Sequence, residues 1–473
     1  MNTYAPADQA FADSLRDRLD PKSYREAEPR YFEEPRGRWT SPVGLVLAPG
    51  SVEEVRQILM AANAARVRVI PYGGGTGLVG AQIPGPGAAP LILSMERMNR
   101  IRDVFPTENI MIVEAGVIMQ DVHEAARKVD RLYPLSLAAK GSARIGGNLG
   151  TNAGGVNVLR YGNARDLCLG VEAVLPDGRV MNGLSRLRKD NTGYDLRNLL
   201  IGSEGTLAVT TAASLKLAPI PAEEGTAFLV VESPDAAVEL LSMAKAQMGE
   251  AVSAFELIKG VSFDFMRAAF PQTQLPFYPA PPWMVLIDIG LARGNDPQSA
   301  LETLFTEAAE AGLVSDGVIA QSEGQRAAFW DIRENMPLAS REVGGICSHD
   351  VSLPLSLIPE FLRRADQLVA GLGPFRINCF GHMGDGNLHY NLFPPEGETR
   401  DKYMPRSKEI YAAVHELVVG MGGSFSAEHG VGRLKIDEMR KFTDPTKLDL
   451  MRGIKALFDP NGIMNPGAVL PDA

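Results

Sequence analysis

The sequence contains few cysteines, and they lie far apart. Only Cys168, Cys347 and Cys379 occur among its 473 residues. Three widely spaced thiols form neither a disulfide framework nor a Cys-rich zinc knuckle. We therefore expect reduced and mostly buried thiols, as is typical of proteins of the cytosol.

Long hydrophobic runs and an excess of positive charge are also lacking. No apolar stretch approaches the ~18–20 residues of a membrane span, so we expect no transmembrane segment. The start, MNTYAPADQAFADSL, lacks the basic and apolar regions of a signal peptide. These features predict a cytoplasmic protein. The net charge of −10 argues against a nucleic-acid partner, because Lys and Arg carry most of the affinity for phosphates.

One glycine-rich stretch spells the dinucleotide fingerprint G-x-G-x-x-G. Residues 71–80 read PYGGGTGLVG and follow the apolar run 67–70. In a Rossmann fold this fingerprint opens a helix, but the next residues, AQIPGPGAAP, contain three prolines and cannot continue one. We therefore predict a loop whose backbone amides can bind an anion without a lysine. A flexible surface loop is the alternative reading of this stretch alone.

Two further glycine-rich stretches follow. Residues 141–155 read GSARIGGNLGTNAGG, and residues 201–207 read IGSEGTL. Their Ser, Thr and Asn side chains can bond phosphate oxygens or ring heteroatoms. Three such loops, set among strands, favour one long ligand that is touched at several points. A dinucleotide fits this description.

In this order, the three stretches resemble the FAD-binding domain of the vanillyl-alcohol oxidase / para-cresol methylhydroxylase superfamily. The resemblance covers roughly residues 40–220 and implies two α+β subdomains that hold FAD, a PCMH-type domain. Some relatives tether the flavin through a His, Cys or Tyr, whereas Thr76 and Leu78 follow the first glycines here, so we expect non-covalent FAD. The resemblance implies that FAD contacts Pro71, Gly73, Gly74, Gly75, Thr76, Gly77, Leu78, Gly141, Ser142, Gly146, Gly147, Thr151, Asn152, Gly154, Gly205 and Val209.

The pattern of strands and helices predicts an α+β protein. We expect strands at 43–47, 66–70, 227–232 and 285–290, and helices at 119–130, 234–247 and 296–311, with another helix that begins in a capping box from Ser51 to Glu54. Alternating elements without glycine loops after residue 222 favour a ferredoxin-like domain. The predicted organisation is an N-terminal helical lead (1–39), an FAD-binding domain (40–221), a substrate domain (222–425) and a C-terminal helical segment that returns to the flavin (426–473).

Three of the six histidines lie in two glycine-containing motifs of the C-terminal region. Residues 376–392, RINCFGHMGDGNLHYNL, read as two strands around a tight turn, so a hairpin can bring His382 and His389 together. The segment SAEHGVG then adds Glu428 and His429. Two imidazoles and a carboxylate form a sound ligand set for a divalent metal. Structural roles are expected for His123 and His415, and the role of His349 stays open between structure and function.

GHMGDGNLHYN and SAEHGVG resemble the C-terminal half of FAD-linked D-2-hydroxyacid dehydrogenases. This group includes D-lactate dehydrogenases and the FAD subunit of glycolate oxidase. SAEHG and the stretch LAAKGS are most similar to the D-2-hydroxyglutarate dehydrogenase branch. The resemblance implies a divalent metal, with zinc as the first candidate, at His382, His389 and Glu428, and His429 as the base. It further implies that Arg333 and Asn391 bind substrate and that Asn465 lies at the flavin.

The implied activity is oxidation of a D-2-hydroxyacid to the 2-oxoacid, with hydride transfer to flavin N5. D-2-hydroxyglutarate is the first candidate substrate. Electrons would pass to an acceptor other than NAD, such as an electron-transfer flavoprotein, a cytochrome or a quinone, and a homodimer is the candidate assembly. Two positions depart from the branch: Ser348 stands where a Lys is frequent, and Pro337 where some relatives have Thr. Loss of the Lys removes a charge-assisted bond of ~1.5–3 kcal/mol, so D-malate and D-lactate stay open.

Two other functions are compatible with these motifs. One is an oxidase that uses O₂, which peroxide release would reveal. The other is a flavin-bearing electron-transfer subunit of a glycolate oxidase-like complex. The complete set of His382, His389, Glu428 and His429 argues against the second, because an electron carrier needs no metal to stabilise an alkoxide.

Overall fold

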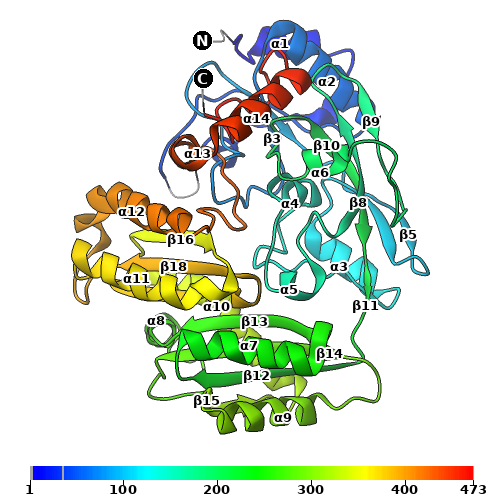
Figure 1. Ribbon diagram of the computed structural model, residues 1–473. Helices are drawn as coiled ribbons and strands as arrows, with labels where there is room; N and C mark the ends of the chain where they lie inside the picture. Colours follow the sequence, from blue (N-terminus) through cyan, green and yellow to red (C-terminus); the bar gives the residue numbers. More distant parts are fainter. Residues whose placement is uncertain (1–3, 35–36, 472–473) are drawn as a thin grey trace. The chain divides into compact units, whose positions relative to one another are not determined.

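The computed structural model describes residues 4–34 and 37–471, and the chain divides into two compact units (Figure 1). Unit 1 comprises Met1–Gly154, Asn163–Ile220 and His429–Ala473, and unit 2 comprises Gly155–Gly162 and Pro221–Glu428. The chain thus leaves unit 1 after Ile220 and returns to it at His429. Each unit has its own hydrophobic core.

Unit 1 is built around two sheets. A four-stranded sheet has the order β1-β2-β4-β3 and pairs β2, β4 and β3 in parallel, whereas a five-stranded sheet of order β5-β6-β10-β8-β9 is antiparallel. The strands are β1 (Tyr24–Arg25), β2 (Leu45–Leu47), β3 (Val69–Tyr72), β4 (Leu91–Ser94), β5 (Ile101–Phe105), β6 (Ile110–Glu114), β7 (Arg131–Leu132), β8 (Cys168–Val174), β9 (Val180–Asn182), β10 (Val209–Lys216) and β11 (Ala218–Pro219). The helices are α1 (Gln9–Ser14), α2 (Val52–Ala65), α3 (Met119–Arg127), α4 (Ile145–Thr151), α6 (Leu196–Leu200), α13 (Ile436–Phe442) and α14 (Pro445–Phe458).

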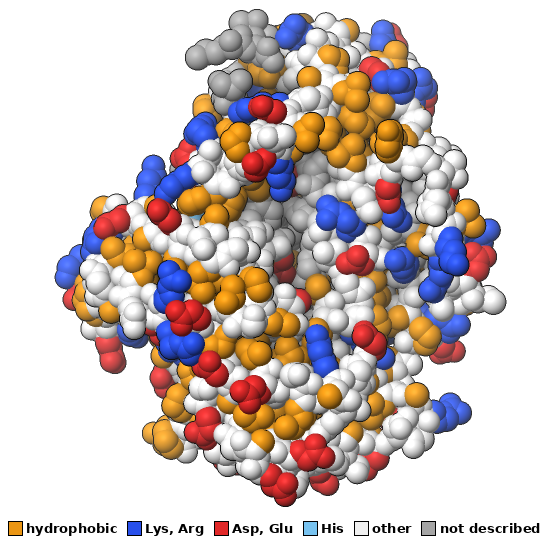
Figure 2. Space-filling model, viewed as in Figure 1, with side chains coloured by type: hydrophobic (Ala, Val, Ile, Leu, Met, Phe, Trp, Pro, Cys, Tyr) orange, Lys and Arg blue, Asp and Glu red, His pale blue; other side chains and the backbone are white. Residues whose placement is uncertain are grey.

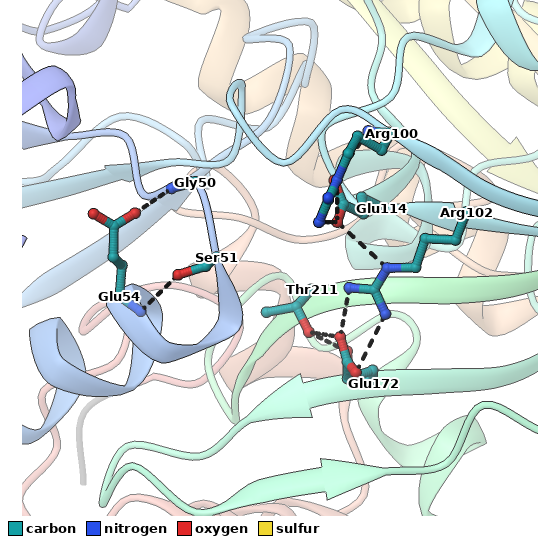
Figure 3. A network of polar contacts seen from close by, with 8 residues as sticks. All are labelled: Gly50, Ser51, Glu54, Arg100, Arg102, Glu114, Glu172 and Thr211. Carbon is teal, nitrogen blue, oxygen red and sulfur yellow. Dashed lines mark hydrogen bonds and ion pairs between the residues drawn. The ribbon is translucent and has the colours of Figure 1, made fainter. Parts of the chain in front are cut away.

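Helix α2 begins where the sequence predicts, but its cap differs in one bond. The Ser51 hydroxyl accepts the amide hydrogen of Glu54, which satisfies one free donor of the first turn. The Glu54 carboxylate accepts the amide of Gly50 rather than that of Ser51, as Figure 3 shows. The capping box is therefore only half formed, and the carboxylate stabilises the loop before the helix instead.

A polar network joins the four neighbouring strands β5, β6, β10 and β8 of the five-stranded sheet (Figure 3). Glu114, at the end of β6, accepts bonds from Arg100 and Arg102. Arg102 also donates to Glu172 of β8 at 3.0 Å, and the hydroxyl of Thr211 on β10 donates to the same carboxylate at 2.9 Å. Burial alone raises the pKa of Glu114, but the two arginines outweigh it and lower the pKa below its ordinary value.

Unit 2 is one seven-stranded sheet of order β15-β12-β14-β13-β17-β18-β16, and all its pairs are antiparallel. Its strands are β12 (Glu223–Val231), β13 (Val252–Lys259), β14 (Trp283–Leu291), β15 (Val314–Ile319), β16 (Cys347–Ser352), β17 (Arg376–Gly381) and β18 (Asn387–Phe393). Its helices are α5 (Val158–Tyr161), α7 (Pro234–Met248), α8 (Val261–Ala269), α9 (Pro297–Glu310), α10 (Glu323–Val343), α11 (Ile358–Leu372) and α12 (Ser407–Gly420).

Helices cover both faces of the unit 2 sheet, as the burial along its strands requires. Successive side chains of a strand point to opposite faces. On β12, Leu229 packs with the helices α7, α9, α11 and α12, whereas Phe228 packs with α8 and α10. The same alternation on β13 sends Leu257 to the first core and Ile258 to the second. Glu256 therefore points towards α10, and this direction places it at the candidate site.

The α+β class predicted from the sequence is confirmed, and element boundaries shift by a few residues. Strand β3 begins at Val69 rather than at residue 66, and α3 ends at Arg127 rather than at residue 130. No helix follows the first glycine loop in residues 73–90, so the exclusion of a Rossmann turn is confirmed. The three cysteines form no disulfide and are buried.

The described residues contain no helix long and apolar enough to cross a membrane. On the face drawn in Figure 2, Lys and Arg side chains are interspersed with Asp and Glu rather than gathered into one basic stripe.

Candidate active site

The predicted hairpin forms and places His389 at its centre. β17 and β18 pair so that Phe380 lies opposite His389, and β16 pairs on the other side so that Asp350 lies opposite the same histidine. Between the strands, a short 3-10 turn over Met383–Asp385 ends at Gly386, whose φ of +87° lies in the left-handed region. His382 stands directly after β17, and its ring centroid lies 5.5 Å from that of His389. The structure thus brings the two imidazoles together.

The Glu428 carboxylate completes a cluster with these two histidines. Its Oε1 lies 3.6 Å from Nε2 of His389 and 3.8 Å from Nε2 of His382. Both distances exceed ordinary hydrogen-bond lengths. Ligand atoms that lie ~2.1 Å from one tetrahedral ion are about 3.4 Å from each other, so the spacing suits a shared metal ion. The amide of Gly155 donates to the second oxygen of Glu428 at 2.9 Å and orients the carboxylate.

Asp350 is a further candidate ligand that the sequence did not predict. Asp350, His389 and Glu428 each offer one ligand atom, and these atoms lie within 4.8 Å of one another. The carboxylate is held by the amide group of Asn387 at 3.0 Å and by the backbone amide of Glu428 at 3.1 Å. The pairing of the strands could have indicated this role. Asp350 lies opposite His389 on the neighbouring strand, whereas the preceding residue, His349, points to the opposite face of the sheet.

Glu256 supports the cluster from the next strand, and the sequence did not single it out either. Its two oxygens lie 2.7 Å from Nδ1 of His382 and 2.6 Å from Nε of Arg333. Burial raises the pKa of a carboxyl, but Arg333 and His382 outweigh it and lower the pKa of Glu256 to about 2. Burial likewise lowers the pKa of His382, but the Glu256 carboxylate outweighs it and raises the pKa to about 9.

This donor set fits a divalent metal. Imidazole and carboxylate groups are ligands of Zn²⁺ and of the first-row metals, and a ligand histidine commonly gives its other ring nitrogen to a carboxylate. Glu256 occupies that position behind His382. An ion held at Nε2 of His382 would displace the proton of that nitrogen and leave the Nδ1 proton bonded to Glu256, because the ligand form of His is neutral.

Arg333 and Asn391, the predicted substrate ligands, both lie in unit 2. Arg333 comes from α10, is 4% exposed, and keeps a buried Nη2 for which the described residues supply no hydrogen-bond acceptor. Such a donor is costly unless an acceptor arrives. Asn391 accepts the hydroxyl of Ser348 at 2.6 Å and donates to the backbone oxygen of His389 at 3.2 Å. Much of its amide is therefore engaged within the protein.

The predicted base His429 follows Glu428 directly in the chain. The division between the two units falls between these two residues, so the last candidate metal ligand belongs to unit 2 and the base to unit 1. The peptide bond keeps the two residues adjacent. Of the histidines expected to be structural, His123 bonds the backbone oxygen of Leu135 at 2.8 Å, and His415 is buried on α12.

The three glycine-rich stretches converge in unit 1. A Cβ on Gly74 would lie only 2.0 Å from the backbone oxygen of Ser142, so the first stretch packs directly against the second. A Cβ on Gly205 would lie 2.8 Å from the ring of Pro71, so the third stretch packs against the first. The glycines let these backbones approach one another closely, and their amides can bind a pyrophosphate. The residues present therefore fit FAD.

The predicted flavin contacts occupy four segments of unit 1. They lie in β3 and its following loop (Pro71, Gly73, Gly74, Gly75, Thr76, Gly77, Leu78), around α4 (Gly141, Ser142, Gly146, Gly147, Thr151, Asn152, Gly154), in the loop before β10 and at its start (Gly205, Val209), and in the C-terminal segment (Asn465). Asn465 donates to the backbone oxygens of Ala81 and Glu204, and it accepts a bond from Arg433. Its side chain thus ties segments of unit 1 together, and its contact with FAD stays a prediction.

Comparison with known proteins agrees with this architecture. A model of the FAD binding domain matches residues 43–183, and a model of the C-terminal domain of FAD linked oxidases matches residues 220–469. The D-2-hydroxyglutarate dehydrogenase of Xanthomonas citri pv. viticola is 36% identical over 91% of this chain and 90% of its own length. The mitochondrial D-2-hydroxyglutarate dehydrogenase of Arabidopsis thaliana is 37% identical over 90% of this chain and 75% of its own.

The fold has a close structural match as well. A crystal structure of p-cresol methylhydroxylase with substrate bound superposes with a TM-score of 0.75 at 15% identity, and the match covers 98% of each chain. At this identity the likeness shows the fold, which is of the PCMH type. Because both domain models match and the identity to these relatives extends over nine tenths of the chain, the protein belongs to the family of FAD-linked oxidoreductases that contains the D-2-hydroxyglutarate dehydrogenases.

Proposed function

We propose that the protein is an FAD-dependent dehydrogenase that oxidises a D-2-hydroxyacid to the 2-oxoacid with the help of a divalent metal. D-2-hydroxyglutarate is the first candidate, after the names of the relatives, and D-malate and D-lactate are the alternatives. The observation that carries the proposal is the cluster in which Oε1 of Glu428 lies 3.6 and 3.8 Å from two imidazole nitrogens. A protein that only carries electrons has no need of such a ligand set.

When bound, FAD supplies the hydride acceptor, and an ion held by His382, His389 and Glu428 supplies a Lewis acid beside the substrate hydroxyl. The side chains of the protein orient the ligands and accept the proton. Glu256 orients the ring of His382 through Nδ1. Nε2 or Nδ1 of His429 accepts the hydroxyl proton as general base.

The substrate carboxylate is proposed to bind Arg333. Its Nε is committed to Glu256, whereas its buried Nη2 still needs an acceptor, and a carboxylate oxygen satisfies it with a charge-assisted bond. This contact would hold the α-carbon in one orientation. Asn391, on the same strand as His389, is proposed to contribute a weaker polar contact.

The electron acceptor is proposed to be an electron-transfer flavoprotein, a cytochrome or a quinone. The proposed metal is zinc. A cytoplasmic location and a homodimer stay predictions.

A screen of D- and L-2-hydroxyacids with a redox dye tests the proposal. The purified protein is assayed as isolated, after EDTA treatment, and after addition of Zn²⁺, Mn²⁺ or Co²⁺. We expect dye reduction with a D-2-hydroxyacid only, loss of turnover with EDTA, and recovery with one of the metals. Full activity after EDTA would contradict the metal, and stoichiometric peroxide without dye would favour an oxidase.

A variant separates loss of the metal from loss of the flavin. Glu428→Ala should keep the FAD absorbance near 450 nm but lose bound metal and turnover. Glu360→Ala, which removes an exposed carboxylate of α11, is the matched control and should keep all three. Loss of FAD from Glu428→Ala would argue for a structural role instead.

A further inference from the structure

The buried carboxylate of Glu204, in the third glycine-rich stretch, accepts hydrogen bonds from the backbone that follows His429. Oε1 of Glu204 accepts the amide of Val431 at 2.8 Å, and Oε2 accepts the amide of Gly432 at 2.9 Å. Two successive amides that point at one carboxylate form a small anion nest. Glu204 is 7% exposed, and its own backbone oxygen accepts a bond from Asn465 at 2.7 Å, so both ends of the residue are held.

The same backbone is fastened to the first glycine loop. A Cβ on Gly432 would lie 2.1 Å from the backbone oxygen of Val79, and φ at Gly432 is +52°, so only glycine fits this close approach. The amide of Arg433 donates to Val79 at 2.9 Å. The Arg433 guanidinium donates to the backbone oxygens of Gly80 and Ala81.

These contacts lie within unit 1 and start two residues after His429, at Val431. Glu204 precedes Gly205, which packs against Pro71 of the first glycine loop. The carboxylate therefore links the loops that form the flavin cradle to the segment that carries His429. By contrast, the neighbouring Glu428 is held by Gly155 and Asp350 of unit 2.

We propose that Glu204 is a positioning residue: by binding the amides of Val431 and Gly432, it fixes the His429 imidazole relative to the flavin loops of unit 1. The role of His429 rests on the proposed function, whereas the clamp itself does not. Burial raises the pKa of the Glu204 carboxyl to about 7, and the amide bonds from Val431 and Gly432 oppose this rise because they stabilise the ionised form.

Glu204→Ala tests the clamp, first without reference to activity. Hydrogen–deuterium exchange of the peptide that contains residues 429–434 should accelerate at least tenfold in the variant, while peptides from β10 keep their protection. FAD and metal contents should stay at wild-type levels. Glu53→Ala, which removes an exposed carboxylate of α2, is the matched control and should change nothing. Unchanged protection of residues 429–434 in Glu204→Ala would overturn the proposal.

Turnover then shows whether the clamp acts through His429. Glu204→Ala should lower kcat at least tenfold with little change in KM. In a protein that already carries His429→Ala, the same substitution should lower kcat less than threefold, because no base is left to be misplaced. Additive losses in the double variant would overturn the positioning role. Glu204→Gln keeps the shape and one acceptor oxygen, so it should give an intermediate kcat and release one amide; it serves as the test if the alanine variant does not fold.

The two proposals fail in different ways. If no 2-hydroxyacid reduces the wild-type flavin, the proposed function fails, and the exchange data alone decide on the clamp. If the wild type is active but Glu204→Ala keeps both its turnover and its protected amides, the clamp fails and the proposed function stands.

Discussion

The carboxylate of Glu256 lies 2.7 Å from Nδ1 of His382, on the side of the ring away from Glu428. The other oxygen of Glu256 bonds Arg333 at 2.6 Å, so one buried acid orients both a candidate metal ligand and a candidate substrate ligand. Strand alternation on β13 and the position of α10 on the same face of the sheet bring these groups together.

Glu256→Gln should weaken metal binding. The amide cannot stabilise a polarised imidazole as a carboxylate does, and loss of such support typically costs 10–100-fold in metal affinity or activity. Metal content after dialysis against a graded chelator, together with kcat, measures the effect. Glu360→Gln, on the surface of α11, is the control. Wild-type metal affinity in Glu256→Gln would contradict this support.

Arg333→Lys should raise KM for the hydroxyacid. Lysine lacks the planar fork, and loss of a charge-assisted bond of ~1.5–3 kcal/mol corresponds to roughly 10–150-fold in kcat/KM. Arg341→Lys, exposed near the end of the same helix, should leave kcat/KM unchanged. The measurement is steady-state kinetics with a dye acceptor, and an unchanged KM in Arg333→Lys would remove Arg333 from the substrate site.

Gly74→Ala should lose FAD. A Cβ would lie 2.0 Å from the backbone oxygen of Ser142, so the first two glycine stretches must separate. Gly453→Ala is a matched control, because a Cβ there meets nothing within 4 Å and alanine favours helix α14. The ratio of absorbance at 450 nm to that at 280 nm reports the bound flavin. Equal flavin content in the two variants would contradict the predicted cradle.

Glu204 should make the stability of the protein fall as the pH rises. Burial raises its pKa from 4.5 to about 7 in the folded chain, so between these values the native state binds more protons than the unfolded state. The contribution is complete below pH 4.5 and is lost as the pH rises through 7, in total about 3 kcal/mol. Urea unfolding of wild type and Glu204→Gln at pH 5 and pH 8 measures it. The two proteins should differ in pH slope, and equal slopes would contradict the raised pKa.

Short sequence motifs predicted much of the candidate site. The spacing of His382 and His389 around a glycine turn predicted a hairpin, and the strands place both rings together because side chains alternate on a strand. The prolines after Gly80 ruled out a Rossmann turn for a similarly local reason, since proline cannot continue a helix. Such predictions need only near neighbours in the chain.

The residues that the sequence missed have distant partners. Glu256 lies in VSAFELIK, a segment that resembles an ordinary core strand, and its partners Arg333 and His382 are 77 and 126 residues away. Glu204 belongs to a glycine stretch predicted to contact FAD, yet its carboxylate holds amides 227 and 228 residues further on. No local pattern encodes which segments of the chain meet.

The sequence by itself determined the α+β class, the three glycine loops, the His-turn-His hairpin and the adjacent pair Glu428–His429, because each depends on backbone geometry and residue type over a few positions. Only the tertiary structure decided that Glu256 supports His382 and Arg333, that Asp350 faces His389, and that Glu204 clamps the segment after His429. The physical reason is that a buried carboxylate needs partners wherever the packing of the sheets brings them, whatever their distance along the chain.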